Sequence, residues 1–137
     1  PGDATGIVEG GNLTVLASLC GTPYELKGNG AILLLEDTGE DPYRVDRMME
    51  QLYQSGLLSR VSAIAYGDFY GASPVGEEFS IHDVLAYYAK LSGKPAIEGV
   101  PVGHGPDNLF LPLGVKATIH AKEDGSAVFS YDESYLK

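Results

Sequence analysis

A continuous apolar run at residues 31–35, with the sequence Ala-Ile-Leu-Leu-Leu, constrains the fold of this chain more than any other feature. A strand with one face in water alternates apolar and polar side chains, so a run without alternation indicates a strand that is covered on both faces. We expect a second buried strand at residues 61–66 and a third strand at residues 96–100. Buried strands of this kind are typical of parallel sheets.

Helical signals separate these three strands. Asp41 followed by Pro42 combines a capping side chain with proline at the first helical position, and this predicts a helix over residues 41–56. A serine cap and a terminal glycine predict another helix over residues 80–93. The resulting order of strand, helix, strand, helix and strand between residues 31 and 100 indicates parallel strands joined by crossover helices.

The two ends of the chain carry different signals. Residues 1–9 resemble linker sequence, and we expect a linker remnant there, followed by one domain over residues 10–137. Asn12 is predicted to cap a short helix. Residues 115–131 alternate apolar and polar side chains around an Asp-Gly turn, which predicts a β-hairpin. The predicted fold class is therefore α/β, a small sheet with a parallel β-α-β-α-β core plus a C-terminal β-hairpin.

The composition argues against several classes of function. The formal net charge of −10 makes nucleic acids and anionic membrane surfaces poor partners. No apolar run approaches the roughly 20 residues that a membrane-spanning helix needs. The single cysteine, Cys20, excludes an internal disulfide and a cysteine-based zinc cage. Because the three histidines are scattered, we expect no metal, and we expect no cofactor.

Glu36 and His104 are the candidate catalytic residues. Each is predicted to follow a strand, and the carboxyl ends of parallel strands share the edge of the sheet where ligands bind. A carboxylate that fixes the tautomer of an imidazole makes it a general base. No serine has the surroundings of an activated nucleophile, so the chain lacks a group for this base to activate. Asn12 and Gly103 are weaker candidates for substrate binding, although an ordinary helix cap accounts for Asn12 equally well.

Several segments, in order from residue 9 to about residue 115, resemble the C-terminal domain of the LD-carboxypeptidases, a family of serine peptidases that includes the microcin-immunity peptidases. The matching segments are Gly10-Gly11-Asn12-Leu13-Thr14-Val15-Leu16-Ala17-Ser18-Leu19, Gly21-Thr22-Pro23-Tyr24, Leu33-Leu34-Leu35-Glu36-Asp37, Glu40 with Pro42-Tyr43-Arg44-Val45-Asp46-Arg47-Met48, Gly67-Asp68-Phe69, Gly103-His104-Gly105, Asn108 and Leu111-Pro112-Leu113-Gly114. The resemblance implies a swivelling β/β/α-like domain. It also implies that Glu36 and His104 complete a triad with a serine from a separate N-terminal domain, which this sequence lacks.

The implied reaction is release of the terminal D-alanine from a muramoyl tetrapeptide during peptidoglycan recycling. The implied partners are the N-terminal serine-bearing domain, the muropeptide and a second copy in a homodimer. The isolated chain is expected to be inactive, because a base without its nucleophile has nothing to activate. We expect the bacterial cytoplasm, with the periplasm as the alternative.

Three other functions stay open at this point. The first is a microcin-immunity-type peptidase that cleaves a peptidyl-nucleotide by the same mechanism. The second is a non-catalytic binding module that kept the scaffold. The third is a metal hydrolase that uses His104 with Asp68 or His120.

Overall fold

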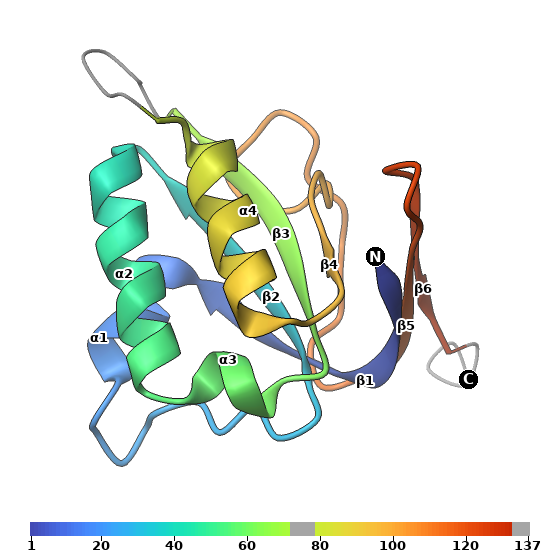
Figure 1. The fold of residues 1–137 in the computed structure, drawn as a ribbon, viewed down its shortest axis with the longest axis horizontal. Coiled ribbons are helices and arrows are strands. Elements are labelled where there is room, and N and C mark those ends of the chain that lie inside the picture. Colours follow the sequence, from blue (N-terminus) through green and yellow to red (C-terminus); the bar gives the residue numbers. More distant parts are fainter. Residues whose placement is uncertain (72–78, 133–137) are drawn as a thin grey trace.

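The computed structural model describes residues 1–71 and 79–132, which form a six-stranded mixed sheet with helices packed against it (Figure 1). The sheet has the order β4-β3-β2-β1-β5-β6. The strands are β1 (Gly2–Asn12), β2 (Ile32–Thr38), β3 (Ala63–Tyr70), β4 (Ala96–Ile97), β5 (Lys116–Ala121) and β6 (Ala127–Tyr131). The helices are α1 (Leu13–Leu19), α2 (Pro42–Gln54), α3 (Leu57–Arg60) and α4 (Ile81–Ser92).

The parallel core predicted from the apolar runs is confirmed. Strands β1, β2, β3 and β4 are parallel neighbours, and the connections from β2 to β3 and from β3 to β4 contain helices. Helix α4 has the predicted start, because the Ser80 side chain accepts from the Asp83 N–H while the Asp83 carboxylate accepts from the Ser80 N–H. The short helix α3 after Gly56 was not predicted.

The expectation of a linker at residues 1–9 is wrong. Residues 2–12 form β1, which lies inside the sheet and pairs in parallel with β2 and antiparallel with β5. Two glycines of β1 mark close backbone contacts. A Cβ on Gly6 would collide with the carbonyl oxygen of Gly30, and a Cβ on Gly10 would collide with that of Leu34.

Apolar side chains fill both faces of the sheet, which explains the absence of alternation in β2. Leu33 and Leu35 face the helices and pack with residues of α1, α2, α3 and α4. Ile32 and Leu34 face the opposite side, where they pack with Val8 and with residues of β5. The predicted hairpin is confirmed as β5 and β6, and β5 adds to the sheet beside β1.

The third predicted strand is shorter than expected. Only Ala96–Ile97 pairs as a strand, yet the chain continues along β3. The Val100 N–H donates to the Tyr66 carbonyl at 3.1 Å, and the Asp68 N–H donates to the Val102 carbonyl at 2.8 Å. These bonds fix the start of the long segment of residues 98–115, which we call the His104 loop. None of the described helices is long and apolar enough to cross a membrane.

Candidate active site

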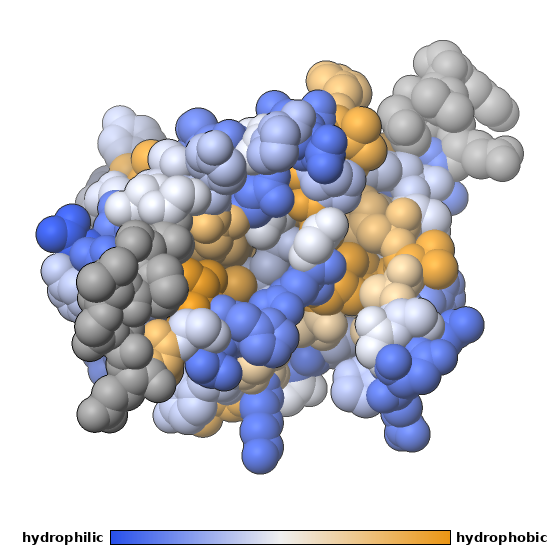
Figure 2. Space-filling view, turned by 90° about the horizontal axis from the view of Figure 1, so that it is seen from above, coloured by the Kyte–Doolittle hydropathy of each residue, from blue (hydrophilic) through white to orange (hydrophobic). Residues whose placement is uncertain are grey.

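The candidate site lies at the edge of the sheet where the parallel strands end. Glu36 lies near the end of β2, just after an irregularity in its pairing with β3, so it belongs to the strand and not to the following loop. His104 lies in the His104 loop, and its Nδ1 atom is 2.9 Å from Oε2 of Glu36. The structure thus brings together the two predicted catalytic side chains. Figure 2 looks onto this face, where apolar surface gathers toward the middle between polar side chains.

The contact between Glu36 and His104 fixes the state of the imidazole. A carboxylate oxygen only accepts hydrogen bonds, so Nδ1 carries the proton, and in the neutral ring Nε2 keeps its lone pair. The Glu36 side chain is 12% exposed and the His104 side chain 55% exposed. The arrangement is therefore a sheltered carboxylate that orients a half-exposed imidazole.

Asn12 supports Glu36 from the neighbouring strand. The two residues are register partners at the ends of β1 and β2. The Asn12 Nδ2 group donates to Oε1 of Glu36 at 3.3 Å, while its Oδ1 atom accepts from the Val15 N–H and caps α1. Both ends of the amide are engaged within the chain, so Asn12 acts here as a helix cap and a support for Glu36. Its contact with substrate stays a prediction.

Asp37 is a further polar residue of the site, and the sequence reasoning did not single it out. Its side chain is the one buried charged group in the described part of the chain, at 3% exposure. Oδ2 accepts from the Thr14 N–H at 2.9 Å and from the Thr14 hydroxyl at 2.7 Å, and Oδ1 accepts from Asn12. This network joins the start of α1 to the end of β2. It also orients the Asn12 amide that donates to Glu36. Its position directly after Glu36 was the one feature of the sequence that could have identified it as part of the site.

Glycines let the His104 loop approach the strand ends. A Cβ on Gly67 would lie 2.6 Å from the Val102 carbonyl oxygen, so only glycine allows the observed contact between β3 and the loop. Gly103 adopts a φ of 131°, which disfavours side chains, and its N–H donates to Oδ1 of Asn108 at 3.3 Å. Gly103 adjoins His104 on the loop, and its predicted contact with substrate also stays a prediction.

The other histidines lie outside this arrangement. His82 pairs with Glu98 at 2.6 Å, and His120 pairs with Asp3 at 3.0 Å. Within residues 1–71 and 79–132, no group of three or more His, Cys, Asp or Glu residues is arranged to hold a metal ion. The hydrogen bond that the structure gives to His104 in this part of the chain goes to the Glu36 carboxylate.

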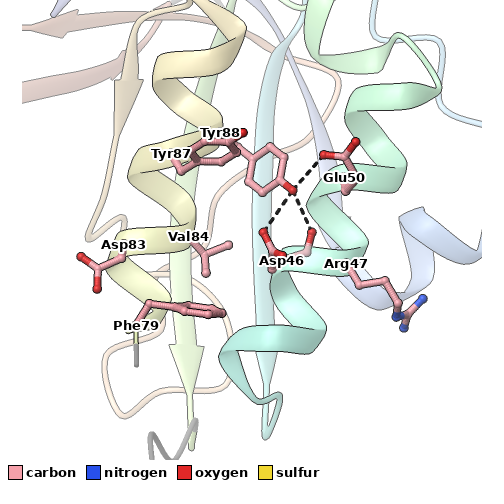
Figure 3. A pocket seen from close by; sticks show the side chains of 8 residues that line it. All are labelled: Asp46, Arg47, Glu50, Phe79, Asp83, Val84, Tyr87 and Tyr88. Carbon is pink, nitrogen blue, oxygen red and sulfur yellow. Dashed lines mark hydrogen bonds between the residues drawn. The ribbon is translucent and has the colours of Figure 1, made fainter. Parts of the chain in front are cut away.

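A hollow lies away from the dyad, on the outer helical layer between α2 and α4 (Figure 3). Its volume is about 680 Å³. At its base the Tyr88 hydroxyl lies 3.1 Å from Oδ1 of Asp46 and 3.0 Å from Oε2 of Glu50. Burial raises the pKa of this phenol, and the hydrogen bonds to Glu50 and Asp46 raise it further. These contacts join the two helices and belong to the packing of the fold.

The sequence from residue 5 to residue 119 matches the family described as the LD-carboxypeptidase C-terminal domain. The chain belongs to this family. As an LD-carboxypeptidase C-terminal domain, it has the overall fold expected from the resemblance, and it places Glu36 and His104 within hydrogen-bonding distance.

Relatives and solved structures agree with this assignment. The chain is 38% identical to a "Probable murein peptide carboxypeptidase" of Bacillus subtilis, over 93% of this chain and 41% of that protein. It is 36% identical to a "Murein tetrapeptide carboxypeptidase" of Pseudomonas aeruginosa, over 83% of this chain and 38% of that protein. The LD-carboxypeptidase C-terminal domain therefore spans about two fifths of the length of these relatives.

Two solved structures have the same fold. The muramoyltetrapeptide carboxypeptidase from Oxalobacter formigenes superposes with a TM-score of 0.83 at 35% identity, covering 95% of this chain and 45% of that one. The microcin C7 self immunity protein MccF superposes with a TM-score of 0.80 at 28% identity, covering 96% of this chain and 39% of that one.

Proposed function

We propose that this chain is the part of a serine LD-carboxypeptidase that supplies Glu36 and His104 to a Ser-Glu-His triad. The reaction is release of the terminal D-alanine from a muramoyl tetrapeptide in peptidoglycan recycling. The observation that carries the proposal is the 2.9 Å contact between His104 Nδ1 and Glu36 Oε2 at the carboxyl edge of the sheet. Relatives of the chain that are named as murein carboxypeptidases support it.

Each side chain has a distinct role in the proposed reaction. His104 takes the serine proton at Nε2 as the hydroxyl attacks the scissile carbonyl, and it later gives that proton to the leaving D-alanine amine. Glu36 accepts from Nδ1–H, fixes the tautomer and stabilises the imidazolium that forms. Asn12 and Asp37 hold Glu36 in the orientation that this requires. Asn12 and Gly103 border the bound substrate.

The serine comes from a separate N-terminal domain. The relatives are more than twice the length that this chain covers, which leaves room for such a domain. The exposed apolar side chains of the His104 loop, Leu109, Phe110 and Leu113, are 60%, 89% and 53% exposed and suit a surface that another domain covers. The half-exposed ring of His104 fits a nucleophile delivered from that domain.

Hydrolysis of a defined muropeptide tests the proposal. The chain alone and the full-length protein that contains it are incubated with a muramoyl tetrapeptide, and released D-alanine is quantified. We expect release by the full-length protein and none by the isolated chain. A tetrapeptide that ends in L-alanine is the matched control substrate. Absence of D-alanine release by a folded full-length protein contradicts the proposed specificity.

The structural likeness to MccF favours a second candidate, a microcin-immunity-type peptidase. It would use the same two side chains on a peptidyl-nucleotide. Presenting both substrates to the full-length protein and comparing kcat/KM separates the two functions. We expect the muropeptide to be preferred, because the relatives with higher identity carry murein carboxypeptidase names.

Two finer features belong to the proposal and rest on the family resemblance. The full-length protein is a homodimer, which light scattering over a concentration series measures. It resides in the bacterial cytoplasm, with the periplasm as the alternative, and cell fractionation with compartment markers decides between them.

A further inference from the structure

One carboxylate beside the dyad has an unsatisfied oxygen. Oδ2 of Asp68 is buried and has no hydrogen-bond partner within the described residues. Asp68 lies near the end of β3, the strand next to the one that carries Glu36. A buried carboxylate oxygen without a donor is costly, so its presence at this position calls for a physical reason.

The surroundings of Asp68 place its side chain against the backbone that carries His104. A Cβ on Gly105 would collide with Oδ2 of Asp68. A Cβ on Gly103 would lie 3.2 Å from Cβ of Asp68 and 3.2 Å from Oε2 of Glu36. The glycines on both sides of His104 therefore contact Asp68, and the Gly103 site contacts both carboxylic residues.

The backbone fixes Asp68 in this position. Its N–H donates to the Val102 carbonyl at 2.8 Å, which joins β3 to the His104 loop two residues before His104. Gly67, directly before Asp68, packs too closely against Val102 to accept a side chain. The main chain at Gly67 and Asp68 is thus held against the loop by these two contacts.

We propose that Asp68 is a positioning residue of the dyad, which supports the Gly103–Gly105 backbone and supplies a second negative charge near the imidazole. Glu36 already neutralises part of the charge on the imidazolium that forms when His104 takes a proton. A second carboxylate beside the loop stabilises that cation further, and its unsatisfied oxygen is compensated while the cation exists. This inference rests on the proposed function for its catalytic consequence, but its electrostatic part concerns this chain alone.

The first test uses the isolated chain and needs no activity. The titration of the His104 ring is followed by NMR in the unchanged chain, in Asp68→Asn and in Asp107→Asn. Glu36 on β2 pairs with the ring, Asp68 on β3 lies against the glycines that flank His104, and the exposed Asp107 lies three positions after it. We expect the titration midpoint in Asp68→Asn to fall by roughly 0.5 to 1 pH unit, because removing a neighbouring negative charge disfavours the imidazolium.

Controls for this titration are built into the chain. His82 and His120 pair with other carboxylates, so their midpoints serve as internal references for the integrity of the fold. Asp107→Asn removes an exposed charge from the same loop and is expected to shift His104 less than Asp68→Asn does. A His104 midpoint that stays unchanged in Asp68→Asn, while both reference histidines behave as in the unchanged chain, overturns the proposal.

The second test measures catalysis in the full-length protein. We expect Asp68→Asn to lower kcat about tenfold with little change in KM, because the charge acts on a cation present only during the reaction. Asp68→Glu, which keeps the charge, is expected to recover part of the loss, and Asp107→Asn is expected to match the unchanged enzyme. A raised KM at unchanged kcat contradicts the inference. Should Asp68→Asn fail to fold, Asp68→Ser removes the same charge with a smaller side chain.

The two arms separate the two hypotheses. A full-length protein without D-alanine release overturns the proposed function, whereas the NMR titration still decides the role of Asp68. An active full-length protein whose kcat is unaffected by Asp68→Asn overturns the role of Asp68 and leaves the proposed function standing.

Discussion

His104 Nδ1 lies 2.9 Å from Glu36 Oε2, although 68 positions separate the two residues in the sequence. The parallel topology accounts for this proximity, because β2 and β3 run in the same direction and the His104 loop returns along the end of β3. Glycines at positions 67 and 103 let the loop approach the strand ends. The dyad is therefore a property of the folded backbone.

Removing either member of the dyad should nearly abolish activity in the full-length protein. We expect Glu36→Gln and His104→Ala each to lower kcat by about 10⁴-fold, by analogy with other triads. The double variant should be little worse than either single variant, because the two side chains act as a unit. His120→Ala, at a histidine that pairs with Asp3 elsewhere, is the control and should keep full activity. Losses in the single variants that multiply in the double variant would argue against a shared role.

Asn12 should affect both stability and activity. Asn12→Ala removes the cap of α1 and the support of Glu36, so we expect a loss of about 1 kcal/mol in the free energy of unfolding together with a lower kcat. Ser80→Ala is the matched control, since it removes the cap of α4 without touching the dyad. Urea unfolding and D-alanine release are measured for both variants. Equal loss of activity in the two would mean that Asn12 acts through stability alone.

The buried Asp37 depends on Thr14. Thr14→Val keeps the side-chain shape but removes the hydroxyl that donates to Oδ2 of Asp37 at 2.7 Å. We expect a cost of about 1 to 3 kcal/mol, because a buried carboxylate loses one of its donors. Thr5→Val serves as the control, since Thr5 makes an exposed hydroxyl contact with Thr118 and should change stability by less than about 0.5 kcal/mol. Chemical denaturation of the isolated chain measures both, and similar values for the two variants would contradict this account.

Much of the fold could be predicted because local signals agreed with the tertiary structure. The apolar run at residues 31–35 predicted a strand covered on both faces, and β2 has buried side chains on each side. The caps at Asn12 and Ser80 fixed the starts of two helices. In each case the residues of one short segment were enough to predict its secondary structure.

The rest depended on contacts between segments that the sequence does not reveal. Residues 1–9 resembled linker sequence, but they form most of β1, and Gly6 is required where the backbones of neighbouring segments touch. Asp68 was considered from the sequence as a metal ligand beside His104, and only the folded loop shows that its Oδ2 atom is buried against the Gly105 position. The pairing of Glu36 with His104 could be predicted in part. Residues that follow parallel strands meet at the carboxyl edge of the sheet, which predicted that the two side chains are close but gave no distance.

Two buried tyrosines should make the isolated chain sensitive to alkali. Burial raises the pKa of Tyr88, with hydrogen bonds to Glu50 and Asp46 adding to the shift, and burial raises the pKa of Tyr66 as well. In the unfolded chain both phenols have a pKa near 10. Each group therefore contributes stability that is fully present below about pH 10 and is lost as the pH rises toward the folded value, because the unfolded chain releases the proton first.

Urea unfolding at pH 8 and at about pH 10.5 checks this expectation. The unchanged chain should lose stability between the two pH values, and Tyr88→Phe should lose less, because it has no proton to release at this position. At pH 8, Tyr88→Phe should be about 1 kcal/mol less stable, since the hydroxyl bond that joins α4 to α2 is gone. Tyr87→Phe, at the half-exposed neighbour on the same helix, is the control and should keep the pH dependence of the unchanged chain. An identical alkaline loss in the unchanged chain and in Tyr88→Phe would show that Tyr88 does not govern this response.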